Sequence, residues 1–181
     1  MPERPVIALT AGDPAGIGPE IIWKLAADPH ISSAAKVVVL GDETALVKAA
    51  RAVGVKPALN LIDDPSKGRF KLGHIDLIPC SWLTEEEHQF CHTDALCGEA
   101  AYQAVCRAVS LVVGGRAQAI CTAPLAKASL HAAGRKFPGH TELLAKLSGS
   151  VDDPVMLLAG PKLKVALATT HMPLNRVPQS L

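Results

Sequence analysis

The chain lacks an excess of either charge sign. Its 181 residues include 18 Lys and Arg against 17 Asp and Glu, a formal net charge of +1, and no long run of one sign occurs. Proteins that bind nucleic acids or membrane surfaces carry a basic or acidic excess on one face or segment. The composition therefore favours small molecules or another subunit as partners, with no nucleic acid and no membrane.

Paired cysteine motifs are also missing. The five cysteines are an odd number and include no C-x-x-C pair. Disulfide frameworks and structural zinc sites are built on such pairs. The N-terminus has no basic segment followed by an apolar one, and no apolar run is long enough to span a bilayer. We therefore predict reduced thiols and a cytoplasmic protein.

Apolar residues make up 49% of the chain and charged residues 19%, enough for one substantial core. Short apolar runs that end in turn residues predict strands, and helical spacing with terminal glycines predicts helices. The expected strands are 6–10, 36–40, 58–62, 74–79, 118–122, 155–159 and 163–169. The expected helices are 20–26, 43–50, 95–113, 125–133 and 141–147. Alternating strands and helices predict an α/β fold, a layered and mainly parallel sheet with helices on both faces.

Ligands of such sheets bind at the carboxyl ends of the strands. Three segments follow predicted strands directly: the loop Thr10 to Gly18, the junction Thr122 to Lys127, and Thr170-His171. His140 would join them from the loop before its helix. We expect these segments to form one cleft.

Each candidate also has a plainer interpretation. The loop from Gly12 to Gly18 has neither the G-x-G-x-x-G spacing nor a Walker lysine, so it could be only a tight turn. Lys127 could be a solvated helix residue. Thr141 could simply cap a helix behind a surface His140. His171 alone cannot make a metal site, because a lone histidine after a strand is more often structural.

Four motifs taken together resemble the 4-hydroxythreonine-4-phosphate dehydrogenase family. They occur in family order and at family-like spacing, and the resemblance runs from Val6 to Leu174. In this sequence they read TAGDPAGIGPE at 10–20, TAPLAK at 122–127, PGHTE at 138–142 with a glycine at 134, and ALATTHMPL at 166–174.

The resemblance implies an isocitrate/isopropylmalate dehydrogenase-like fold and a homodimer. It also implies NAD-dependent oxidation of 4-phosphooxy-L-threonine, with decarboxylation to 3-amino-2-oxopropyl phosphate, in pyridoxal phosphate biosynthesis. A divalent metal, which could be zinc, cobalt, manganese or magnesium, would act as Lewis acid. By motif, His140 and Thr141 would bind the substrate and His171 would be the first metal ligand. Asp13, Thr122 and Lys127 are expected to line the cleft.

The resemblance further implies that residues 1–181 are the N-terminal portion of a two-lobed dehydrogenase whose second lobe is largely absent. The remaining metal histidines and most cofactor contacts would lie in the part that should follow, so we expect these residues alone to be inactive. Two other hypotheses stay open. One is a paralogous dehydrogenase for threonate or erythronate 4-phosphate, and the other is a non-catalytic ligand-binding remnant.

Overall fold

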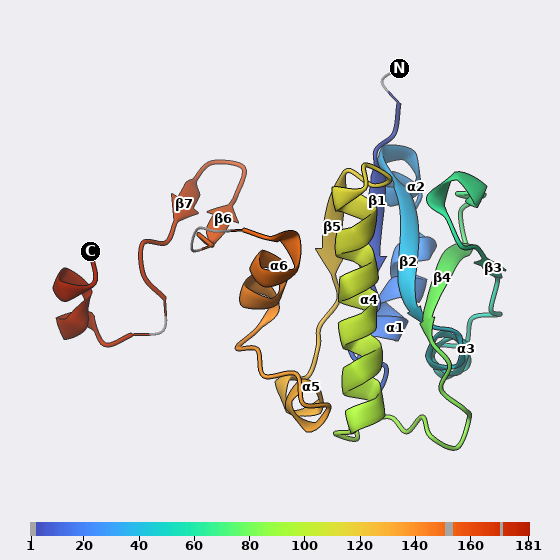
Figure 1. The fold of residues 1–181 in the computed structure, drawn as a ribbon. Helices are drawn as coiled ribbons and strands as arrows, with labels where there is room; N and C mark the ends of the chain where they lie inside the picture. The colour runs from blue at the N-terminus through green and yellow to red at the C-terminus, as the bar shows by residue number, and fades with distance from the viewer. Residues whose placement is uncertain (1–2, 151–153, 171) are drawn as a thin grey trace. The chain divides into compact units, whose positions relative to one another are not determined.

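The computed structural model describes residues 3–150, 154–170 and 172–181. The chain divides into two compact units, Met1–Pro138 and Gly139–Leu181. The first unit is built on a five-stranded parallel sheet in the order β3-β4-β2-β1-β5 (Figure 1). The strands are β1 (Val6–Thr10), β2 (Lys36–Asp42), β3 (Leu59–Leu61), β4 (Ile75–Ser81) and β5 (Ala119–Thr122).

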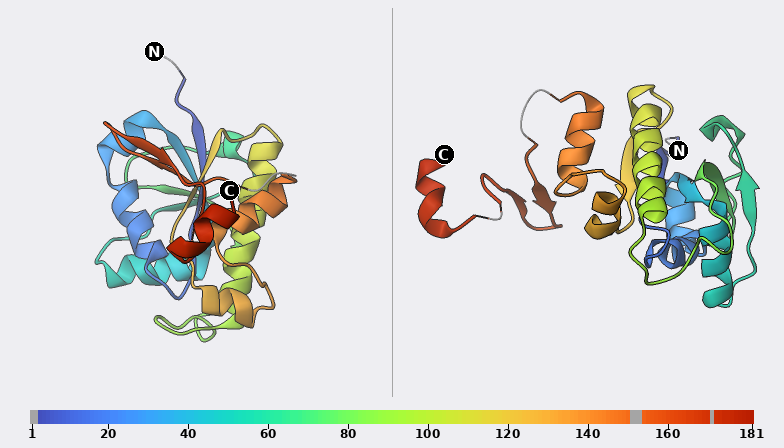
Figure 2. Two further views of the ribbon diagram at one scale, coloured as in Figure 1. Left: turned by 90° about the vertical axis from the view of Figure 1, so that its left-hand side faces the viewer. Right: turned by 60° about the horizontal axis from the view of Figure 1, so that its bottom comes forward.

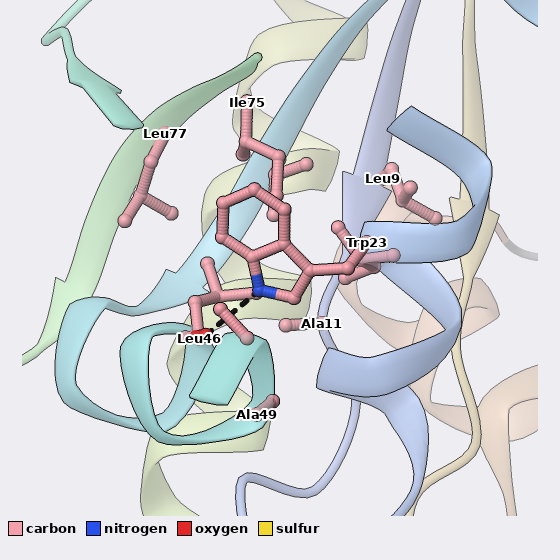
Figure 3. Packing of buried hydrophobic residues seen from close by; sticks show 10 residues of the cluster. Leu9, Ala11, Trp23, Leu46, Ala49, Ile75 and Leu77 are labelled. Atoms are coloured by element: carbon pink, nitrogen blue, oxygen red, sulfur yellow. Dashed lines mark hydrogen bonds between the residues drawn. The ribbon is translucent and has the colours of Figure 1, made fainter. Parts of the chain in front are cut away.

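One face of the sheet is covered by α1 (Gly18–Ala26) and α3 (Glu43–Ala52). Trp23 of α1 is 2% exposed, and its Nε1 donates a hydrogen bond to the carbonyl oxygen of Leu46 at 2.7 Å (Figure 3). A buried indole needs such an acceptor, because an unpaired N–H in an apolar core costs free energy. This bond therefore joins the two helices over the sheet.

The other face is covered by α4 (Ala95–Val113), the long helix on the opposite side of the sheet from α1 and α3 (Figures 1 and 2). Small residues dominate its buried side, including Ala104 and Ala108 against Ala8 and Val38. By length and composition α4 could cross a membrane. Its packing on the sheet identifies it as a core helix instead.

The remaining elements are short. The first unit also contains α2 (Pro29–Ala34), the 3-10 turn η1 (Pro65–Lys67) and α5 (Lys127–Ala132), which packs on α4. The second unit contains α6 (His140–Ser148), an antiparallel hairpin of β6 (Leu157–Ala159) and β7 (Lys164–Ala166), and the turn η2 (Leu174–Gln179).

Most predicted elements are confirmed. Each expected strand and helix appears, and the helix expected at 95–113 has those bounds. The sequence pattern missed α2, although Asp28 caps it and Pro29 opens it, because the helix has no buried residue and hence no apolar periodicity. The five cysteines are free in the structure.

Candidate functional site

The connections between strands change from one face of the sheet to the other beside β1, and this point is called the winding reversal. β1 pairs with β2 on one side and with β5 on the other. The helix after β1 covers one face of the sheet, whereas α5, which follows β5, packs with α4 on the opposite face. The two loops therefore leave the carboxyl ends of β1 and β5 in opposite directions. Parallel sheets bind their ligands at such points.

The first of these loops, residues 11–17, is called the glycine loop here. The backbone N–H of Asp13 donates to the carbonyl oxygen of Pro124 at 3.0 Å, which ties the glycine loop to the segment after β5. Within the loop, the Asp13 carboxylate accepts from the N–H of Ala15 at 2.8 Å, and the Asp13 carbonyl accepts from Gly16 at 2.9 Å. Asp13 is 3% exposed, so the loop is a closed turn built around its carboxylate.

Gly12 permits this close approach. Its φ is +74°, and a Cβ at this position would lie 2.1 Å from the carbonyl oxygen of Pro124. Any side chain would both disfavour the left-handed backbone and overlap the neighbouring loop. The sequence expectation that the loop lies beside the 122–127 segment is therefore met by backbone contact.

Thr122 is the last residue of β5 and is aligned with Thr10 of β1. Thr122 is half-buried. Thr10 is fully buried, and its Oγ1 has no hydrogen-bond partner among the residues described. Lys127 is exposed at the first position of α5. Asp13 thus lies in the glycine loop, whereas Thr122 and Lys127 stand at the two ends of the segment that this loop contacts through Pro124.

α6 appears in the second unit where a helix was expected, but it begins at His140, one residue before the expected start at Thr141, so His140 lies in the helix and not in the loop before it. Gly139 occupies the N-cap position, and no side chain caps the helix. The first N–H groups of a helix that lacks a cap can donate hydrogen bonds to an anion. His140 is half-buried, its Nε2 has no partner in the described part of the chain, and burial lowers its pKa. Burial thus favours the neutral form of the His140 imidazole, one residue before Thr141.

His171, the expected metal ligand, lies outside the described residues. Within residues 3–150, 154–170 and 172–181, no group of three or more His, Cys, Asp or Glu side chains could hold a metal ion. These residues by themselves do not fit the implied metal.

The sequence pattern gave no reason to select His88. This histidine follows Glu85-Glu86-Glu87 in a segment without regular structure, and its context suggests an ordinary surface residue. In the structure it is 1% exposed, and its Nε2 lies 2.8 Å from the carbonyl oxygen of Pro14 in the glycine loop. Local sequence carries no signal for this contact, because the two residues are 74 positions apart.

Comparison with known proteins agrees with this geometry. The family described as pyridoxal phosphate biosynthetic protein PdxA matches residues 33–181. The chain belongs to this family. Among curated PdxA-family relatives, D-threonate 4-phosphate dehydrogenase of Cupriavidus necator is 45% identical over 168 residues, 93% of this chain and 50% of the relative. A 4-hydroxythreonine-4-phosphate dehydrogenase of Geobacter metallireducens is 39% identical, over 97% of this chain and 52% of its own length.

A solved structure gives the same result. The 4-hydroxythreonine-4-phosphate dehydrogenase from Burkholderia phymatum superposes with a TM-score of 0.87 at 42% identity, over 94% of this chain and 51% of that one. The chain thus spans about half the length of the PdxA-family proteins that it matches. The predicted α/β fold of the isocitrate dehydrogenase type is confirmed, and the relatives are named as dehydrogenases, which places the family among the oxidoreductases.

Proposed function

We propose that this chain provides part of the substrate site of an NAD-dependent dehydrogenase for a 4-phosphorylated four-carbon hydroxy acid. The first candidate substrate is 4-phosphooxy-L-threonine. Its secondary alcohol would lose a hydride to NAD and a proton to a base, and the resulting ketone would lose carbon dioxide to give 3-amino-2-oxopropyl phosphate. The reaction belongs to pyridoxal phosphate biosynthesis.

The observation that carries this proposal is the start of α6. An anionic substrate needs donors that are not already used, and the uncapped first turn of α6 supplies backbone N–H groups next to the Thr141 hydroxyl. His140 adds an imidazole whose burial lowers its pKa and favours the neutral form, which can accept or donate one hydrogen bond. Both residues belong to the PGHTE motif, which supports substrate binding as their role.

The residues of the first unit would have a supporting role. We propose that Asp13, Thr122 and Lys127 line the cleft, because they lie in or at the ends of the two loops that leave β1 and β5 at the winding reversal. The Lys127 ammonium, exposed at the first position of α5, suits a phosphate or carboxylate. His171 would provide one ligand of a divalent metal. The other ligands would come from the half of the relatives that this chain does not match. When bound, that metal would act as Lewis acid toward the substrate oxygen.

A second candidate substrate is D-threonate 4-phosphate, which lacks the amino group. Its support is the 45% identity to a relative of that name, against 39% for a relative named for hydroxythreonine phosphate. Erythronate 4-phosphate belongs to the same chemical class.

A substrate panel tests the proposal. The 181-residue chain and a version extended to the length of its relatives are each incubated with NAD, a divalent metal and one of three substrates, and NADH formation is followed. We expect turnover of one substrate by the extended version and none by the chain alone. Substrate binding without turnover in the extended version would favour a ligand-binding remnant. No binding and no turnover would reject the proposed function.

The site residues are tested in the extended version. Thr141→Val removes the hydroxyl with little change of volume, and we expect a higher KM for the phosphorylated substrate. Thr44→Val is a matched control, because the Thr44 Oγ1 donates to the Leu83 carbonyl oxygen within the first unit and Thr44 is not part of the PGHTE motif. Equal effects of the two substitutions on KM would contradict the role of Thr141.

A further inference from the structure

An irregular segment between β4 and α4, residues 84–94, contacts the glycine loop and is called the strap here. In Figure 1 it is the green loop that leads from β4 to the start of α4. The side chain of Lys48 in α3 donates to the carbonyl oxygens of Glu85 at 2.9 Å and His88 at 2.6 Å. Arg51 of the same helix pairs with the Glu85 carboxylate at 3.2 Å. The first half of the strap is thus fixed to α3.

The strap contacts the tip of the glycine loop through two hydrogen bonds. His88 Nε2 lies 2.8 Å from the carbonyl oxygen of Pro14, and the N–H of Cys91 donates to the carbonyl oxygen of Ala15 at 2.9 Å. A carbonyl oxygen only accepts, so His88 must carry its hydrogen on Nε2. Two consecutive carbonyls of the loop therefore depend on the strap.

Stability alone is a poor explanation for a histidine here. The ring is 1% exposed, packs edge-on against Phe90 at a centroid distance of 4.9 Å, and leaves Nδ1 without a partner among the described residues. A buried nitrogen without a partner is destabilising, and an apolar side chain of similar size would avoid that penalty. What an apolar side chain would lose is the hydrogen bond to Pro14.

We propose that His88 is a positioning residue that fixes the glycine loop through the Pro14 carbonyl. Pro14 lies between Asp13 and Ala15 in the sequence. The Asp13 carboxylate closes the turn by accepting a hydrogen bond from the N–H of Ala15. Holding the Pro14 carbonyl holds this turn, and with it the loop that faces the 122–127 segment. The link to catalysis rests on the proposed function, in which this loop lines the substrate cleft.

Amide hydrogen exchange of the 181-residue chain tests the proposal without substrate. His88→Leu removes the donor, whereas His88→Gln keeps an N–H at about the reach of Nε2. We expect the amides of Ala15, Gly16 and Cys91 to exchange about fivefold to tenfold faster in His88→Leu, the size expected for one lost hydrogen bond. His88→Gln should restore most of the protection, and the amides of β1 and β2 should keep their rates in both variants.

His131→Leu is the matched control, because its Nε2 also contacts a backbone carbonyl, that of Phe137 at 3.2 Å, away from the glycine loop. It should leave the loop amides unchanged. Nitrogen NMR of His88 should show a protonated Nε2 and an unprotonated Nδ1. Unchanged loop protection in His88→Leu, equal loss in His88→Gln, or the opposite tautomer would each overturn the proposal. The exchange experiment uses no substrate, so its result does not depend on the substrate panel. A failed panel would reject the proposed function but not the role of His88 in fixing the glycine loop.

Discussion

At the scale of single residues, Gly12 is a position in the glycine loop where a side chain has no space. Gly12→Ala would place a methyl group 2.1 Å from the Pro124 carbonyl oxygen at a φ of +74°. We expect the free energy of unfolding to fall by about 3 kcal/mol or more, measured by urea denaturation. Gly54→Ala is the control, since Gly54 has a φ of +71° but nothing within 4 Å of the added methyl group. It should cost only about 1 kcal/mol, and similar losses at both positions would contradict the loop contact.

His140 makes the second prediction at this scale. Burial lowers its pKa from the ordinary 6.5, so the folded chain binds this proton less readily than the unfolded chain. Its contribution to stability is therefore complete above pH 6.5 and is lost as the pH falls through the folded pKa. NMR titration should give a His140 pKa below 6.5, and His140→Gln should remove that part of the pH dependence. A measured pKa above 6.5 would contradict the burial of the ring.

At the scale of elements, Asp42 joins three of them. Its carboxylate caps α3 through the N–H of Ala45 at 3.0 Å and also accepts from Ser81 Oγ at 2.8 Å and the N–H of Leu83 at 2.9 Å. Asp42→Ala would leave two buried N–H groups and the half-buried Ser81 hydroxyl without this acceptor, and we expect a loss of about 2 to 4 kcal/mol in thermal or urea unfolding. Asp28→Ala removes only the cap of α2, a bond to His30, and should cost about 1 kcal/mol or less. The reverse order of the two losses would disprove the central role of Asp42.

Sequence patterns predict single helices and strands better than the pairing between them. Apolar runs such as 6–10 and 36–40 predicted the strands, because both faces of a parallel sheet are buried and leave a continuous apolar signal. The Pro-Gly turn before α6 predicted a helix from Thr141, and the structure begins it one residue earlier, at His140. The strand order and the contact of His88 with Pro14 could not be predicted, because they depend on pairing between residues far apart in the chain. The predicted metal role of His171 stays a prediction.

At the scale of the whole molecule, the β6–β7 hairpin predicts association. Val155, Leu157, Leu158 and Leu163 are 56–68% exposed, and a short two-stranded hairpin is marginal in water by itself. Contiguous exposed apolar surface drives association, so light scattering should find a dimer or larger species. Leu158→Glu should weaken it, whereas Leu72→Glu, at a residue that is 50% exposed in the first unit, should not. A clean monomer of the unmodified chain would disprove this prediction.

The buried position of Trp23, whose indole binds the Leu46 carbonyl oxygen, also affects the fluorescence of the protein. The chain contains only two tryptophans. Trp23 is 2% exposed between α1, α3 and the sheet, whereas Trp82, just before the strap, is 83% exposed. Acrylamide should therefore quench the red-shifted emission of Trp82 and leave the blue-shifted emission of Trp23. The spectrum of the unmodified protein thus reports separately on the core and on the approach to the strap, without any added label.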